Sequence, residues 1–488
     1  MTAATYDIVV RGGAIATANG TTKADIGVSD GTIAAIGFDL PPGAREIDAT
    51  GRLVLPGGVD GHCHIEQLSA AGIMNADTWE SATRSAALGG TTSVIAFAAQ
   101  HVGMSLAQVV EDYSALAQAG AVVDYAFHMI VADPTAATLR DDLPTLIRAG
   151  HASIKVFMTY DRLRIEDEGL LDLLLVAREN SALVCAHAEN HGMIAWASRR
   201  LIERGHTAPK FHAMSHPRLA ETEAIERLIR LAALVDQPIM IFHVSTAEGA
   251  AIIRRARGEG LKVYAETCPQ YLFLTASDLD KPGPKGAKWM CSPPPRAAAD
   301  QEALWRALAL GDLQTVSSDH APYAYDETGK LRAGPDASFK QIANGLPGLQ
   351  WRLPLLFDAM VSQGRLGLAA FVELTAGAPA RLYNLPGKGA IGIGYDADLA
   401  IWEPDRVVTI DDGMVVDLTG YTPYAGRTVR GWPVTVLRRG EAIVEDGAVR
   451  AQAGSGRHLP RTGGPAAEPA GRLEPEMDPA RNFGARLL

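Results

Sequence analysis

Short apolar runs alternate with amphipathic stretches along residues 53–322, and this alternation limits the folds open to the chain. The amphipathic stretches, such as SLAQVVEDYSALAQAG and AETEAIERLIRLAALV, repeat apolar residues at helical spacing. Eight apolar runs have the pattern of buried strands: LVLPGGVDGHCH, TTSVIAFAA, VDYAFHMIV, ASIKVFMTY, ALVCAHAEN, PIMIFHVST, KVYAETCP and TVSSDHAP. Eight strands mostly separated by helices predict an α/β fold, a parallel (β/α)8 TIM-type barrel.

The two ends of the chain have a different texture from the middle. Near the start, YDIVVRGGAIATANG and ADIGVSDGTIAAIG are β-branched runs with Gly and Asp-Gly turns, and WPVTVLRRGEAIVEDGAVR repeats this pattern late in the chain. We therefore predict one small β-sandwich built from residues 1–55 and 385–455, beside a barrel of residues 56–384. Residues 456–488, rich in Pro, Gly, Ala and Arg, are expected to form an extended C-terminal arm.

Composition narrows the class of protein. The net charge of -11 and the absence of a dense Lys or Arg run argue against a nucleic-acid or an anionic membrane partner. No apolar stretch has the length of a membrane span, and the first residues lack the pattern of a secretory signal. The four cysteines have no CxxC spacing, which predicts neither a disulfide framework nor a cysteine zinc site. A cytoplasmic location is the simplest expectation.

Two histidines lie at the end of the first predicted strand. Residues i and i+2 of a strand project to the same face, so His62 and His64 point together while Cys63 turns away. An isolated pair of this kind is more often two hydrogen-bonded strand histidines than a metal site. Four further candidate ligands lie on or at the ends of later strands, namely Lys155, His187, His243 and Asp319. Because the carboxyl ends of barrel strands share one rim, these residues together predict a metal centre.

Lys155 is the unusual member of this set, since a protonated amine cannot bind a cation. A buried lysine beside two dications would lose its proton, and the neutral amine could add carbon dioxide to form a carbamate that bridges two metals. A lysine paired with a carboxylate is the structural alternative. A Schiff base with a carbonyl substrate, as in aldolases, is the chemical alternative, but it leaves the histidines and Asp319 unexplained.

These residues resemble the binuclear amidohydrolase superfamily, and more narrowly its cyclic amidohydrolases, the dihydropyrimidinases and hydantoinases. The resemblance extends from about Tyr6 to Pro460. The shared motifs are PGGVDGHCH, GGTTSVIAF, IKVFMTY, CAHAEN, HVST, ETCPQYL, CSPPPR, SSDHAPY, NGLPG, DADLAIW and GWPVTVLRRGE.

The resemblance implies a role for each candidate residue. One metal is expected on His62, His64, Asp319 and a carbamate of Lys155 (N6-carboxylysine), and a second on the same carbamate with His187 and His243. Tyr160 matches the tyrosine that donates its hydroxyl to the substrate carbonyl, and Ser292 and Asn344 match positions whose backbone groups hold the cyclic amide edge. Asp319 is expected to move the proton from the attacking water to the leaving ring nitrogen.

The implied activity is metal-dependent ring opening of a dihydropyrimidine or hydantoin to an N-carbamoyl amino acid. Two divalent metals, expected to be Zn²⁺, suit these donors, although Mn²⁺, Co²⁺ or Ni²⁺ fit as well. The resemblance also implies a small-molecule cyclic amide substrate and a homotetramer. An allantoinase or a cyclic-imide hydrolase with the same metal centre, and a noncatalytic scaffold related to the family, are the alternatives.

Ring selectivity is expected in the loops after strands one, two and four. Apolar residues in and beside these loops suggest a pocket wall that accepts a hydrophobic ring substituent, although they would serve equally well as plain packing under a loop. These residues are Ile65, Leu68, Ile73, Met74, Phe97 and Phe157.

Overall fold

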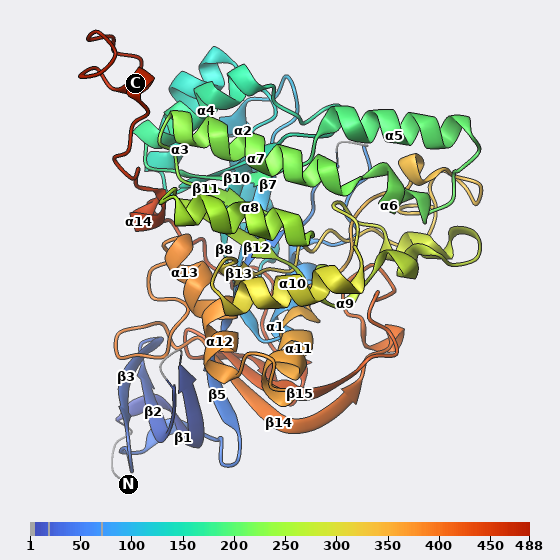
Figure 1. Cartoon of the computed structure of the whole chain (residues 1–488). Helices are drawn as coiled ribbons and strands as arrows, with labels where there is room; N and C mark the ends of the chain where they lie inside the picture. The colour runs from blue at the N-terminus through green and yellow to red at the C-terminus, as the bar shows by residue number, and fades with distance from the viewer. Residues whose placement is uncertain (1–4, 18–19, 70–71) are drawn as a thin grey trace.

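The computed structural model, which describes residues 5–17, 20–69 and 72–488, confirms the α/β barrel (Figure 1). Eight parallel strands follow one another around it in chain order. They are β6 (Gly58–Cys63), β7 (Thr91–Ala99), β8 (Asp124–Ile130), β9 (Ser153–Phe157), β10 (Leu183–His187), β11 (Ile239–Ile241), β12 (Val263–Thr267) and β13 (Thr315–Val316). Cys63 and His320 form a parallel bridge just beyond β13, so the first and last strands of the barrel meet.

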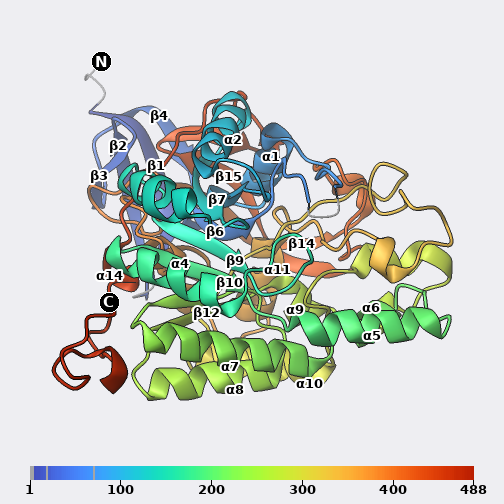
Figure 2. The ribbon, with the colours of Figure 1, turned by 90° about the horizontal axis from the view of Figure 1, so that it is seen from above.

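Helices lie between successive strands, as the amphipathic stretches predicted, and cover the outside of the barrel (Figure 2). Polar caps start several of them: the Thr78 side chain, for example, accepts from the backbone N–H of Ser81 at the start of α1. Those within the barrel region are α1 (Trp79–Leu88), α2 (Leu106–Gly120), α3 (Leu143–Arg148), α4 (Asp167–Glu179), α5 (His191–Glu203), α6 (Phe211–Ser215), α7 (Arg218–Leu234), α8 (Ala247–Gly258), α9 (Pro269–Phe273), α10 (Ala298–Ala309), α11 (Arg352–Phe357), α12 (Leu368–Val372) and α13 (Ala378–Leu382).

Both faces of the barrel strands are buried, because helices cover one face and the opposite wall covers the other. In β7, Val94, Ala96 and Ala98 pack in the large cluster that includes the helix residues, whereas Ile95 and Phe97 belong to a second cluster within the barrel. Near-continuous apolar runs in the sequence follow directly from this double burial. None of the helices formed by the described residues combines the length and apolar character required to cross a bilayer.

Strands from both ends of the chain join in one hydrogen-bonded sheet. Its core combines Val10 and Ile26 from the start of the chain with Leu399, Ile401 and Leu437 from its later part. This sheet contains β1 (Tyr6–Thr17), β2 (Gly20–Ser29), β3 (Thr32–Gly37), β4 (Gly43–Asp48), β5 (Leu53–Pro56), β14 (Leu399–Thr409), β15 (Thr428–Arg438), β16 (Glu441–Glu445) and β17 (Ala448–Val449). Because β5 pairs with β14 and leads directly into β6, the sheet holds the first barrel strand in position.

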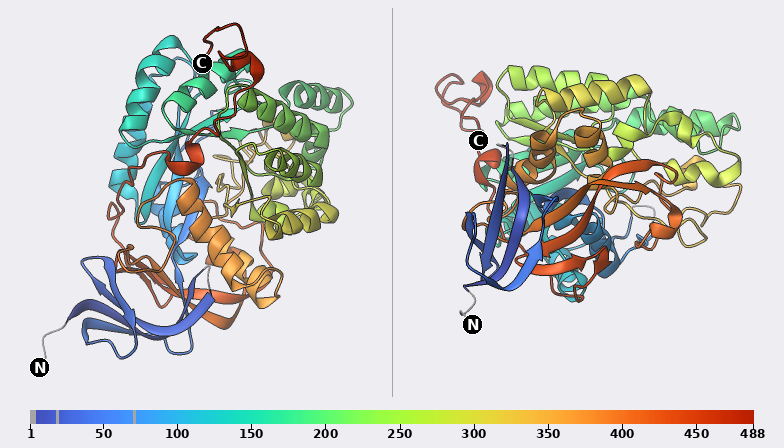
Figure 3. Two further views of the ribbon diagram at one scale, coloured as in Figure 1. Left: turned by 60° about the vertical axis from the view of Figure 1, so that its left-hand side comes forward. Right: turned by 90° about the horizontal axis from the view of Figure 1, so that it is seen from below.

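The segment after the sheet runs along the barrel and then leaves it (Figure 3). Leu459 donates its backbone N–H to Tyr125 at the start of β8, and the buried Arg461 side chain donates to Phe127 O and Ser153 Oγ. The short helix α14 (Gly464–Ala467) follows. The backbone N–H groups of residues 470–472 donate to the Asp236 carboxylate on the barrel, and the chain projects outward after them (Figure 1). The first part of the predicted arm is therefore attached to its own barrel.

Candidate metal centre

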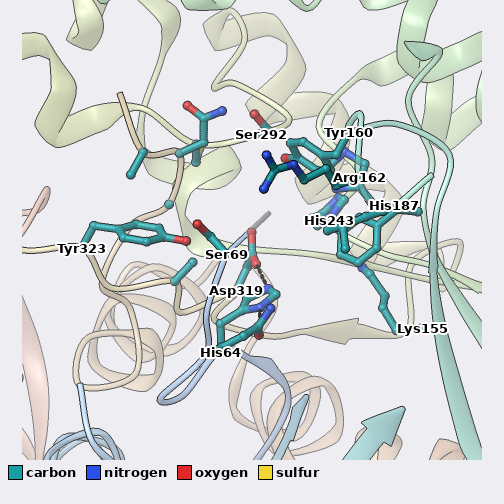
Figure 4. A pocket seen from close by; sticks show the side chains of 18 of the residues that line it. His64, Ser69, Lys155, Tyr160, Arg162, His187, His243, Ser292, Asp319 and Tyr323 are labelled. Carbon is teal, nitrogen blue, oxygen red and sulfur yellow. Dashed lines mark hydrogen bonds and ion pairs between the residues drawn. The ribbon is translucent and has the colours of Figure 1, made fainter. Parts of the chain in front are cut away.

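All six predicted metal ligands line one cavity of about 380 Å³ at the carboxyl ends of the barrel strands (Figure 4). Their positions follow the strands: His62 lies in β6 and His64 directly after it, Lys155 in β9, and His187 at the end of β10. His243 and Asp319 lie shortly after β11 and β13. Cys63 packs in the apolar cluster outside the strands, so the two histidines share the opposite face as predicted.

His62, His64 and Asp319 form the first half of the site. Asp319 Oδ1 lies 3.1 Å from His62 Nε2 and 3.6 Å from His64 Nε2, and one donor atom from each residue falls within 4.8 Å of the others. Although burial opposes ionisation, the imidazoles of His62 and His64 hold the pKa of Asp319 well below its usual range. Burial lowers the pKa of His64, which favours the neutral form that can bind a metal.

His187, His243 and Lys155 form the second half. The His187 and His243 rings lie 4.5 Å apart between centroids, and His243 Nδ1 is buried without a hydrogen-bond partner among the described residues. Burial lowers the pKa of Lys155 to about 8, so the neutral amine is accessible near neutral pH. Its Nζ atom faces the Phe242 ring at 4.0 Å, and no ion pair joins it to a carboxylate in the described parts of the chain.

Two buried carboxylates that the sequence did not single out orient the histidines. Glu266, from β12, lies 2.5 Å from Nδ1 of His62, and Glu189 lies 2.7 Å from Nε2 of His187. A carboxylate on one ring nitrogen leaves the other nitrogen free to bind a metal, namely Nε2 of His62 and Nδ1 of His187. Both acids belong to the motifs CAHAEN and ETCPQYL, but nothing local to those motifs shows that their side chains face histidines.

Tyr160 lies beside this group, with its ring centroid 5.2 Å from that of His187. Burial and the nearby Glu189 carboxylate raise its pKa, so the phenol remains a donor. Tyr160, His243 and Asp319 all have left-handed backbone, with φ of 71°, 43° and 47°. Non-glycine residues seldom adopt this conformation, and where they do the surrounding structure must hold them in it.

Ser292 and Asn344 line the same cavity on two segments that are tied together. The backbone N–H of Gly345 donates to Met290 O at 2.9 Å. The buried Lys330 ammonium donates to Met290 O at 3.3 Å and to Ala343 O at 2.8 Å. Lys330, which the sequence did not identify, therefore joins the backbone beside both predicted substrate contacts.

The predicted apolar wall is largely absent from the cavity. Of its six residues, Phe157 is the one that lines the cavity in the described structure. Phe97 is buried, and its ring centroid lies 4.4 Å from that of His64, so it packs against a predicted metal ligand. Ile65 is buried but does not line the cavity, and Leu68 and Met74 are exposed. The packing alternative describes Phe97, Ile65 and Ile73, which are buried without lining the cavity, whereas the exposed Leu68 and Met74 fit neither interpretation.

Comparison with known proteins agrees with this geometry, since residues 53–443 match the model of the amidohydrolase family. The chain belongs to that family. It is 41% identical to a D-hydantoinase of Rhizobium radiobacter over 90% of this chain and 96% of that protein. A D-hydantoinase structure superposes with a TM-score of 0.91 at 40% identity, covering 93% of this chain and 99% of the other. The dihydropyrimidinase of Brevibacillus agri NCHU1002 gives the same TM-score and coverage at 37% identity.

The donor set fits the metal dependence of the amidohydrolase family. Imidazole nitrogens and a carboxylate are ligands that suit Zn²⁺ and similar divalent ions. The unpartnered His243 Nδ1 and the buried Lys155 amine lie among them, and both would be costly to bury without a further partner. This arrangement can hold cations beside a substrate-sized cavity.

Proposed function

We propose that this protein hydrolyses the ring of cyclic ureides, dihydropyrimidines or hydantoins, to N-carbamoyl amino acids. The observation that carries the proposal is the single cavity in which six candidate ligands face Tyr160, Ser292 and Asn344. The similarity to D-hydantoinases over more than nine-tenths of the chain supports the same substrate class. A noncatalytic scaffold would not need to retain every one of these groups.

Two metals would be held by residues already described. His62, His64, Asp319 and a carbamate of Lys155 would hold one ion, and the same carbamate with His187 and His243 the other. Zn²⁺ is the expected ion, although Mn²⁺, Co²⁺ or Ni²⁺ would suit the donors. When bound, such ions polarise a substrate carbonyl and acidify water.

The protein groups account for substrate orientation and proton transfer. The Tyr160 hydroxyl would donate to the carbonyl oxygen as negative charge develops, a contribution of roughly 2.7–4 kcal/mol for one such donor. Backbone groups of Ser292 and Asn344 would hold the amide edge of the ring. The oxygen of water adds to the ring carbonyl carbon, and the carbon–nitrogen bond breaks. An Asp319 carboxylate oxygen would take the proton from the water and give it to the leaving nitrogen.

The test is a substrate panel assayed with purified, metal-loaded protein. Hydantoin and dihydrouracil are expected to give N-carbamoyl products, with higher specificity constants than allantoin or succinimide. Tyr160→Phe should lower kcat by roughly 100-fold while leaving metal content unchanged, because it removes one donor and no ligand. Metal-loaded protein that opens only allantoin, or no ring at all, would contradict the proposal.

A further inference from the structure

The side of the cavity away from the candidate metal ligands carries two hydroxyl groups. Ser69 from the loop after β6 and Tyr323 from the loop after β13 supply them, whereas Gln67, from the same loop as Ser69, lies against the metal ligands with its Oε1 2.7 Å from His64 Nδ1. The Tyr323 hydroxyl interacts with the side chains of Ser69 and Asn75, and burial raises its pKa to about 12, so it remains protonated. Figure 4 shows Ser69 and Tyr323 together on one side of the cavity. Ala321 and Ala343 line the cavity beside Tyr323, so this wall combines hydroxyl groups with small apolar side chains.

Arg162 faces this wall from the loop after β9. Its guanidinium points into the cavity in Figure 4, and the residue belongs to the cavity lining. Arg162 makes no hydrogen bond or ion pair with any residue in the described ranges, whereas Arg164, two residues later, lies 2.5 Å from Glu166. Arg162 is exposed at the mouth of the cavity, and its guanidinium, which points inward without a protein partner among the described residues, is available to a ligand.

The acidic residues that line the cavity lie against other cationic or imidazole groups and do not pair with Arg162. Asp161 also lines the cavity, but its carboxylate lies 3.3 Å from His191 and 4.0 Å from Lys340. The carboxylate of Asp319 faces His62 and His64. Lys340 also lines the cavity, and Asp161 offsets its charge, which leaves Arg162 as the cation without an acidic partner among the described lining residues of the mouth. The mouth of the cavity therefore presents positive charge beside neutral hydroxyl and amide groups.

A carboxylate is the ligand that this combination fits best. The planar guanidinium of arginine matches both oxygens of a carboxylate, and hydroxyl donors such as those of Ser69 and Tyr323 can bind the same group. A cavity of about 380 Å³ has room for a five- or six-membered ring with a short side chain.

We propose that the substrate is a cyclic ureide whose ring carbon carries a short carboxylate side chain, and that Arg162 selects it. This inference rests on the proposed function and specifies the substrate class of that site. Hydrolysis adds one water: its oxygen bonds to the ring carbonyl carbon, the carbon–nitrogen bond breaks, the nitrogen takes one proton, and the new carboxylic acid releases the other to solvent as it ionises to a carboxylate. The product is an N-carbamoyl amino acid with two carboxylates.

The experiment compares hydantoins that carry a carboxyethyl or a carbamoylethyl group, which have similar shape and differ in charge. The wild-type kcat/KM is expected to favour the carboxyethyl compound by roughly tenfold or more, as a charge-assisted pair would give. Arg162→Gln should bring the ratio of the two specificity constants near one, and Arg162→Lys should restore part of it because it keeps the charge without the planar fork.

Arg164→Gln is the matched control, because Arg164 lies on the same loop, is exposed and does not line the cavity. It should retain the wild-type ratio. Unsubstituted hydantoin and dihydrouracil, assayed alongside, report the proposed function itself. Turnover of these rings without a preference for the carboxylate, or a preference that Arg162→Gln leaves intact, would overturn the assignment of Arg162. Failure to open any ring would instead refute the proposed function.

Discussion

Lys330 provides the sharpest test of the structure outside the metal ligands. The residue is 1% exposed, and its ammonium donates to two backbone carbonyls, with no carboxylate paired to it in the described structure. Burial lowers its pKa from the usual 10.5 to about 7, and the nearby Cys291 only partly opposes this. Lys330→Met keeps a side chain of similar length and removes the titrating group.

The sign of the pH effect on stability follows from how many protons Lys330 binds in the native and in the unfolded state. Between the native pKa near 7 and the unfolded value near 10.5, the unfolded chain binds more protons at Lys330 than the native protein. Raising the pH in this window therefore stabilises the native state, and the effect is lost below it because both states are then protonated. From about pH 7 to about pH 8.5 the wild type should gain about 1.5–2 kcal/mol of unfolding free energy from this residue.

The assay is urea unfolding at both pH values and one protein concentration for wild type, Lys330→Met and Lys285→Met. Lys285 is exposed and serves as the control for the loss of a positive charge. The difference between wild type and Lys330→Met should change by about 1.5–2 kcal/mol, and that between wild type and Lys285→Met by much less. An equal pH response in wild type and Lys330→Met would refute a buried lysine with a lowered pKa.

Three further predictions concern the metal centre and the C-terminal segment. Lys155→Ala should abolish activity, and short carboxylates such as acetate should restore part of it; rescue would be absent if the lysine formed a Schiff base, which borohydride trapping would detect. Glu266→Gln should lower metal affinity by roughly 10- to 100-fold in chelator competition, with unchanged circular dichroism, because the His62 ring loses its orienting carboxylate. The family resemblance predicts a homotetramer, and a chain truncated after Arg461 is expected to elute as a smaller species in size-exclusion chromatography while its barrel remains folded; an oligomer unchanged from that of the full chain would exclude a bridging role for the tail.

The site is partly predictable from the sequence because a barrel brings strand ends together. Once β6, β10 and β11 are recognised as parallel strands, His62, His187 and His243 must lie at one rim. The two-residue spacing of His62 and His64 also fixes their common face. These inferences need only local patterns and the rule that relates strand ends in the fold.

The substrate side of the cavity could not be predicted in this way. Its lining comes from loops, whose paths depend on what they pack against. Apolar residues in the loop after β6, such as Leu68, therefore failed to predict the wall, and Ser69 and Tyr323 meet across loops far apart in the chain. Arg162 and Arg164 look equivalent in the sequence, but only the second has an acidic partner.

The sequence by itself determined the barrel, the joining of both chain ends in one β-rich unit, and the set of metal-binding candidates, because strand and helix periodicity records which faces are buried. Only the tertiary structure decided which carboxylates hydrogen-bond to the histidines, which lysine joins the segments that carry Ser292 and Asn344, and which arginine of the cavity has no acidic partner among the described residues. Those features depend on contacts between residues separated by up to several hundred positions, such as His62 with Glu266, and side-chain pairing over such distances leaves no periodic signal in the chain.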